Sequence, residues 1–106
     1  MATLSLRRRA EKRIPVRMFV KLSVPDSGRF EITQTIDISR HGARVVSKRS
    51  WEHNQHLLLR SLRGNFTSYA RVAHCETLSN NSYTLGLQLL NPTGAWPTSD
   101  LLPAHP

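Results

Sequence analysis

Apolar and polar residues alternate along most of this 106-residue chain. Because side chains two apart in a β-strand lie on the same face, such alternation predicts strands with one buried face. We expect six strands, at residues 16–24, 30–38, 43–47, 56–62, 66–76 and 83–89. The fifth alternates imperfectly, which indicates a bulge. In the second, the apolar side chains expected to face the interior are Phe30, Ile32, Ile36 and Ile38.

Turn-forming residues separate several of these segments. The sequences PDSG at 25–28, RGN at 63–65 and SNN at 79–81 are typical of tight turns. No long helical pattern lies between the predicted strands. The pattern therefore favours an all-β domain, either a small antiparallel barrel or a sandwich.

The character of the chain changes after Leu90. Four prolines and one glycine predict an irregular tail over residues 92–106, with at most one helical turn around 98–102. We expect this tail to cover an open end of the barrel with three apolar side chains, Trp96, Leu101 and Leu102.

Positive charge is concentrated at the start of the chain. The net charge is +8, and residues 1–21 hold seven Lys or Arg and one Glu, whereas residues 72–106 hold no Lys or Arg. A flexible basic arm at residues 1–15 predicts an anionic partner such as a nucleic acid, a nucleotide, phosphate or an anionic surface. Pro15 favours an extended backbone, so the arginines of the arm are not committed to a helix face.

The length and the apolar runs limit the class of protein. A chain of this size is expected to form one domain with one modest core. No apolar run approaches the roughly 20 residues of a membrane helix, and the first residues lack the apolar core of a signal peptide. We therefore expect a cytoplasmic protein without a membrane contact. The single cysteine, Cys75, excludes an internal disulfide and is expected to be core-facing or partly buried.

The sequence DISRHG at residues 37–42 combines an acid, a hydroxyl and a glycine at the end of a predicted strand. If Ile38 faces the core, Asp37 and Ser39 project outward side by side, where together they can bind the N–H edge of a guanine-like ring. Gly42 allows a ligand or another backbone to come close. Taken alone, however, these six residues are more typical of a polar turn in which both side chains bond local amides.

The arm and this turn together resemble the PilZ domain family. The family's first motif, R-x-x-x-R, matches RAEKR at 9–13, and its second, D-x-S-x-x-G, matches DISRHG. The sequence RIPV resembles the family's entry into its first strand, and YTLGLQLLN at 83–91 resembles its closing strand. The resemblance covers about residues 7–91 and implies a six-stranded antiparallel barrel, here at residues 16–91, that binds the bacterial second messenger cyclic di-GMP.

The resemblance also implies roles for individual residues. Arg9 and Arg13 would hold phosphate and the Hoogsteen edge of guanine, while Asp37, Ser39 and Gly42 would contact a guanine from the barrel surface. An arginine binds phosphate and guanine through paired, parallel hydrogen bonds, which suits these roles.

Three further residues are candidates for the ligand site. Arg8 precedes the first motif, and an arginine there resembles the family members that hold a stacked pair of ligands. Arg7 is a candidate for an assisting contact. His74, on the fifth predicted strand, is placed where some members stack an aromatic ring on guanine, although a plain surface histidine fits the sequence equally well.

Catalytic and metal-binding signals are weak. We find no glycine-rich phosphate loop and no hydrolase serine motif. His74 and Cys75 are adjacent, so on a strand they point to opposite faces and do not form a nucleophile–base pair. His53 and His56 lack a third ligand nearby. We therefore expect no enzyme, no catalytic residue, no metal site and no cofactor.

The leading hypothesis is a non-enzymatic receptor of cyclic di-GMP, in which ordering of the arm is the signal to an unidentified effector protein. One alternative is a small basic barrel that binds RNA or DNA, although its few aromatic residues do not interleave with the basic ones as a base-stacking platform requires. Another is a PilZ-like interaction module without a ligand.

Overall fold

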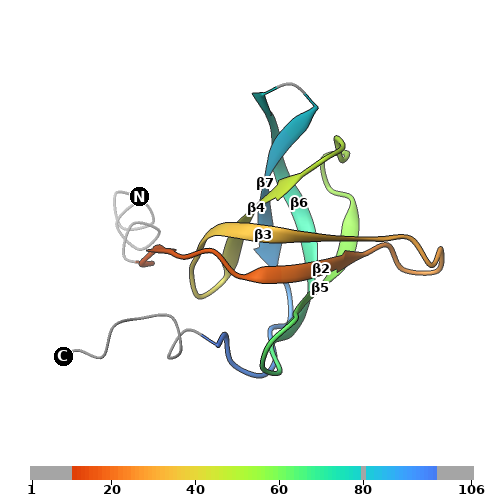
Figure 1. The fold of residues 1–106 in the computed structure, drawn as a ribbon. Helices are drawn as coiled ribbons and strands as arrows, with labels where there is room; N and C mark the ends of the chain where they lie inside the picture. Colours follow the sequence, from red (N-terminus) through yellow and green to blue (C-terminus); the bar gives the residue numbers. More distant parts are fainter. Residues whose placement is uncertain (1–10, 80, 98–106) are drawn as a thin grey trace, which may run out of the picture.

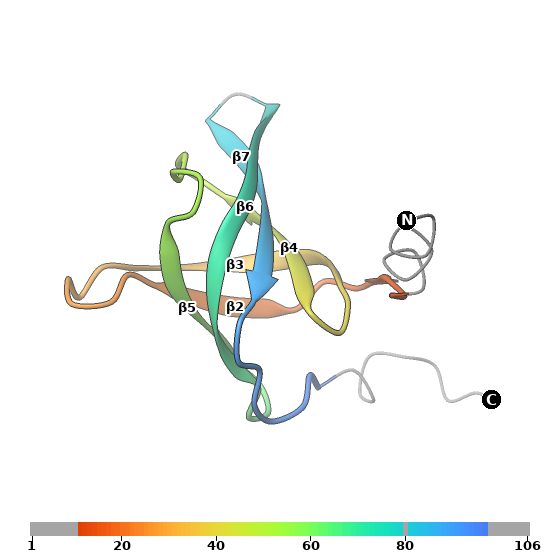
Figure 2. The same cartoon turned by 180° about the vertical axis from the view of Figure 1, so that it is seen from behind.

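The computed structural model describes residues 11–79 and 81–97, and these residues form seven β-strands and no helix. Figures 1 and 2 show the strands from two opposite sides. In chain order they are β1 (Ile14–Pro15), β2 (Phe19–Ser23), β3 (Phe30–Ile38), β4 (Gly42–Ser47), β5 (His56–Ser61), β6 (Thr67–Ser79) and β7 (Ser82–Leu89). Within the described ranges, no helix is therefore available to cross a membrane.

Six of the strands form a closed barrel. They are hydrogen-bonded in the order β3–β2–β5–β6–β7–β4, and a further pairing of β3 with β4 closes the sheet. All pairings are antiparallel. The structure confirms the predicted six-stranded antiparallel barrel and adds the two-residue strand β1, which lies against the end of β3.

Apolar side chains from all six barrel strands and from the segments between them fill the interior. Removing each of them from water contributes roughly 1.5–3 kcal/mol to folding. The buried core consists of Met18, Val20, Leu22, Ile38, Ala43, Val45, Trp51, Leu57, Leu59, Phe66, Ala70, Val72, Leu85, Leu87 and Leu89.

The predicted inward face of β3 is wrong over its first half. A register shift between Thr35 and Asp37 leaves Ile36 as an extra, half-buried residue opposite β4. A bulge of this kind changes which side chains point inward. Beyond it Ile38 is in the core, as predicted, but before it Thr35 faces inward instead, so Phe30 and Ile32 lie on the outside with 58% and 51% of their surfaces exposed.

The end of the arm is bonded to β3 both through β1 and through the short segment between β1 and β2. Ile14 and Pro15 of β1 pair with Ile38 and Asp37, so the last two residues of the predicted arm form a strand. Thr35, which is 1% exposed, bridges the gap before β2: its hydroxyl donates to the carbonyl of Val16 at 2.6 Å and accepts from the amide of Met18 at 2.9 Å.

The described part of the tail lies against the loop between β5 and β6. Trp96 stacks on Phe66, with ring centroids 3.9 Å apart, and packs against the core, whereas Leu101, Leu102 and the predicted helical turn at 98–102 lie outside the described residues. Gly94 has a φ of +76°, and a Cβ there would come within 2.2 Å of the carbonyl oxygen of Asn65. A glycine is therefore required at this crossing.

The fifth predicted strand, β6, contains the expected bulge. Its register against β7 shifts between Val72 and His74. Cys75 consequently packs against the core and is partly buried, as predicted, while His74 is exposed.

Candidate functional site

Asp37 lies near the end of β3 and is only 6% exposed, because two arginines cover its carboxylate. Arg13 donates from Nη1 to Oδ1 at 2.9 Å, and Arg44 donates from Nε and Nη2 to Oδ2 at 3.1 and 3.0 Å. Arg44 lies opposite Asp37 on β4, whereas Arg13 immediately precedes β1. Both arginine side chains remain about half exposed or more, whereas the Asp37 side chain is 9% exposed, so these ion pairs face solvent on the arginine side only.

A row of outward-facing positions continues from Asp37 around the barrel. Arg44 on β4 opposes Gly86 on β7, and Gly86 opposes His74 on β6. A Cβ built on Gly86 would approach Cδ2 of His74 to 3.0 Å. The imidazole therefore lies over the glycine, in space that a side chain at that position would fill. A carboxylate, a guanidinium and an imidazole thus follow one another across four neighbouring strands, with Gly86 between the guanidinium and the imidazole.

Ser39 and Gly42 hold the short loop between β3 and β4 together. The amide of Ser39 donates to the carbonyl of Gly42 at 2.9 Å. A Cβ on Gly42 would lie 3.2 Å from Ser39 Oγ and 3.3 Å from the carbonyl oxygen of Leu87, which is tighter than nearly all real contacts. The glycine therefore allows the close approach of the loop, the Ser39 hydroxyl and β7.

The carboxylate of Glu11, which lies between Arg9 and Arg13 of the first motif, is bonded to this loop. The hydroxyl of Ser39 donates to Oε1 of Glu11 at 3.0 Å, the amide of His41 donates to the same oxygen at 3.4 Å, and Nδ1 of His41 lies 2.8 Å from Oε2. Ser39 is therefore only 8% exposed. The carboxylate is an internal anion placed on one of the candidate ligand residues.

The ionisation of Glu11 follows from these contacts. The hydrogen bond with the His41 side chain, assisted by Ser39 and opposed by burial, lowers the pKa of the Glu11 carboxyl below its ordinary value of 4.5. Because the folded pKa is lowered, the contribution of this contact is complete above about pH 4.5 and is lost as the pH falls through the lowered pKa. Glu11 therefore remains on the loop as a carboxylate at neutral pH.

Comparison with known proteins identifies the family of this chain. Residues 7–95 match the PilZ domain family over most of the chain. The chain belongs to the PilZ domain family. PilZ domains are non-enzymatic receptor domains that typically bind cyclic di-GMP.

A solved structure supports the fold. The inhibitor of motility (MotI/DgrA) of Bacillus subtilis is similar to this PilZ domain with a TM-score of 0.66 and 17% sequence identity, over 81% of this chain and 44% of that chain. This chain therefore spans less than half the length of that protein. No curated protein matches the chain.

Four of the predicted site residues lie together at the junction of the arm with the PilZ barrel. Asp37 contacts Arg13, and Ser39 and Gly42 form the adjoining loop. His74 lies further along the same outer row, three strands from Asp37 in the order β3–β4–β7–β6. The remaining predicted residues lie outside the described ranges; they are Arg7, Arg8 and Arg9.

Sequence reasoning missed Arg44 and Glu11. Arg44 had a usable signal, because it alternates with the core residues Ala43 and Val45 and follows Asp37 across a short loop, which places it opposite Asp37 in a hairpin. Glu11 had none, because its contacts with the loop cross 28 and 30 residues of sequence.

The weak metal hypothesis gains no support. In the described part of the chain, no three His, Cys, Asp or Glu side chains lie close enough together to hold a metal ion. His53 precedes β5 and His56 begins it, and both are exposed.

Proposed function

We propose that this PilZ domain binds cyclic di-GMP at the junction of the arm and the β3–β4 loop. The observation that carries the proposal is the contact of Arg13 with Asp37, which brings the two PilZ motifs together across 24 residues of sequence. A phosphate-binding cation and a guanine-binding carboxylate then lie side by side, as one ligand containing both groups requires.

Binding would exchange the internal partners of these residues for ligand. Arg13 would leave Asp37 and donate to a ligand phosphate, while Asp37 and Ser39 would accept from and donate to a guanine edge. Gly42 would permit the base to approach the loop. The ligand would therefore replace the present ion pair and hydrogen bonds with contacts of the same chemical kind.

Further contacts are proposed for residues before Arg13 and for β6. Arg9 would share the phosphate and guanine contacts of Arg13, and Arg7 would assist. An arginine at position 8 favours a stacked pair of ligands over a single one. His74 would stack on a guanine from the far end of the outer row, since its imidazole is exposed and lies over Gly86.

The signal would be the ordering of the arm, residues 1–15, over the ligand, with the pairing of Ile14 and Pro15 to β3 as its fixed end. The domain has no catalytic role in this proposal, so the ordered arm and the ligand together would form the surface that an effector protein recognises.

Calorimetric titration with cyclic di-GMP tests the proposal. Wild type is expected to release or absorb heat on binding, and Arg13→Ala to bind at least about tenfold more weakly, because one charged hydrogen bond contributes roughly 1.5–3 kcal/mol. Arg60→Ala is the matched control, since it removes an exposed arginine of β5 and the same charge. Absence of heat from wild type at roughly 50 μM ligand, where a micromolar binder saturates, would overturn the proposal.

The same samples separate the two alternatives. If the arm binds RNA or DNA instead, a polynucleotide will bind with a steep salt dependence and cyclic di-GMP will not compete with it. If the domain is an interaction module without a ligand, neither titrant will give heat.

Glu11→Gln is expected to tighten cyclic di-GMP binding by about two- to fivefold at neutral pH. The substitution weakens the internal contact with Ser39 and His41, and exposed contacts to a carboxylate are worth up to about 1 kcal/mol. Glu52→Gln removes the same charge from an exposed loop position and is expected to change the affinity less. Weaker binding by Glu11→Gln than by Glu52→Gln would show that Glu11 helps to hold the ligand.

A further inference from the structure

A second surface of the barrel is apolar and exposed. It lies on the outside of β2, the first half of β3, and β5, and we call it the β2–β5 face. Its exposed apolar side chains begin with Phe19, 56% exposed, and Phe30, 58% exposed. The full set consists of Phe19, Phe30, Ile32 and Leu62, with the half-buried Leu58 and the exposed Tyr69 continuing it toward β6.

The strand register makes this face continuous. Lys21, in the middle of β2, opposes Ile32 on one side and Arg60 on the other. Ser23 opposes Phe30 and Leu58. The apolar side chains therefore belong to neighbouring positions on three paired strands and are not scattered singly, which is the arrangement that marks an interaction surface.

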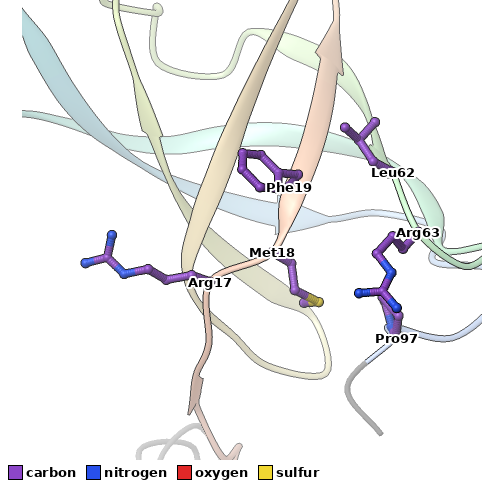
Figure 3. Close-up of a pocket in the computed structure, with 6 residues that line it drawn as sticks. All are labelled: Arg17, Met18, Phe19, Leu62, Arg63 and Pro97. Carbon is purple, nitrogen blue, oxygen red and sulfur yellow. The ribbon is translucent and has the colours of Figure 1, made fainter. Parts of the chain in front are cut away.

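A pocket of about 260 Å³ opens at one end of this face. Figure 3 shows Phe19 and Leu62 in the upper part of the view, Met18 below them, and Arg63 beside Pro97. Its lining is formed by Arg17, Met18, Phe19, Leu62, Arg63 and Pro97. This volume is large enough to accept one large apolar side chain from a partner.

The charge on and around this face is positive. β2 and β5 contain no carboxylate, but they contribute Lys21 and Arg60, and Lys21 Nζ lies 4.4 Å from the centroid of the Phe30 ring. The one carboxylate in the first half of β3, Glu31, is bonded to Ser47 and to the amide of Lys48. Two arginines line the pocket as well.

We propose that the β2–β5 face docks a partner protein segment that carries apolar side chains flanked by carboxylates. One apolar side chain would enter the pocket between Phe19 and Leu62, and the carboxylates would pair with Lys21 and Arg60. Such a segment matches the face both in its apolar surface and in its charge, and complementary charge is what fixes the choice of partner. This proposal does not require cyclic di-GMP.

Two other occupants match the face less well. A second copy of the chain would place Lys21 and Arg60 against identical cations in a symmetric interface, which is costly. A flat anionic membrane would satisfy the cations but would leave the pocket without the protruding side chain that its shape accommodates.

An NMR titration of the ¹⁵N-labelled full chain tests this. The probe is a short synthetic peptide with one phenylalanine and two leucines flanked by glutamates, and the control peptide has lysines in place of the glutamates. We expect the acidic peptide to shift the amide signals of β2 and β5, and the basic peptide to leave them unchanged. Phe19→Ser is expected to weaken binding of the acidic peptide about tenfold, as loss of a central aromatic anchor does.

Leu78→Ser is the matched control variant. Leu78 is 54% exposed, nearly as much as Phe19, but lies at the far end of β6, so its loss is expected to leave peptide binding unchanged. A well-dispersed spectrum of each variant establishes that it is folded. The proposal is overturned if neither peptide shifts β2 and β5 at millimolar concentration, if both bind equally, or if both variants weaken binding alike. It is equally overturned if Phe19→Ser abolishes self-association or binding to anionic vesicles without affecting the peptide.

Discussion

Asp37→Ala is expected to weaken cyclic di-GMP binding by at least about 100-fold. The carboxylate can accept two hydrogen bonds from a guanine edge, and two charge-assisted bonds contribute roughly 3 kcal/mol or more. The variant also leaves Arg13 and Arg44 without the acceptor that now holds both of them beside the loop. The substitution frees Arg13 for phosphate, but this gain is smaller than the loss of two guanine contacts because Arg13 makes a single hydrogen bond to Asp37.

Calorimetry on three variants separates the roles of this side chain. Asp37→Asn keeps one acceptor oxygen and the volume of the side chain, so it is expected to bind with intermediate affinity. Glu52→Ala removes an exposed carboxylate elsewhere and is expected to bind like wild type. Unchanged or tighter binding by Asp37→Ala would mean that the carboxylate serves only to hold the two arginines.

Thr35→Val is expected to lower the free energy of unfolding by about 2–4 kcal/mol. The Thr35 hydroxyl is the buried partner of both the Val16 carbonyl and the Met18 amide, and valine leaves these two backbone groups unsatisfied at about 1–3 kcal/mol each. For a domain of this size the loss corresponds to a fall in Tm of roughly 10–20 °C.

Thermal and denaturant unfolding measure the effect of Thr35→Val. Thr33→Val is the matched control, because Thr33 is half-buried and its hydroxyl makes one bond, to the carbonyl of Val46 at 2.6 Å. We expect the control to lose about 1 kcal/mol. Equal losses in the two variants would indicate that the bridge across the gap between β1 and β2 carries no special stability.

The strands of the barrel were predictable because alternation and turn residues are local signals. The inward face of β3 was not predictable, because either of the two alternating sets of residues around Ile36 could face inward. Only pairing with β4 decides that Thr35 faces inward before the bulge and Ile38 after it. Phe30 and Ile32 therefore resembled core residues in the sequence, although they lie on the outer surface.

For the candidate site, the sequence predicted that the two motifs lie together, but not which contacts their side chains make. The two motifs named Arg13, Asp37 and Ser39 as candidates, and the structure brings Arg13 to Asp37. That Asp37 and Ser39 are nearly buried under Arg44 and Glu11 depends on contacts that the motifs do not contain. Such contacts arise only when the arm and the loop meet in three dimensions.

The bridge made by Thr35 also bears on how PilZ chains like this one can diverge. It anchors Val16 and Met18 to β3. The structural effect of a substitution before Ile14 is therefore not passed on to the barrel beyond this anchor. The segment that would hold a ligand can therefore accumulate substitutions without disturbing the core. We expect gain or loss of ligand binding in evolution to leave the β2–β5 face intact, so that selection can act on the two surfaces separately.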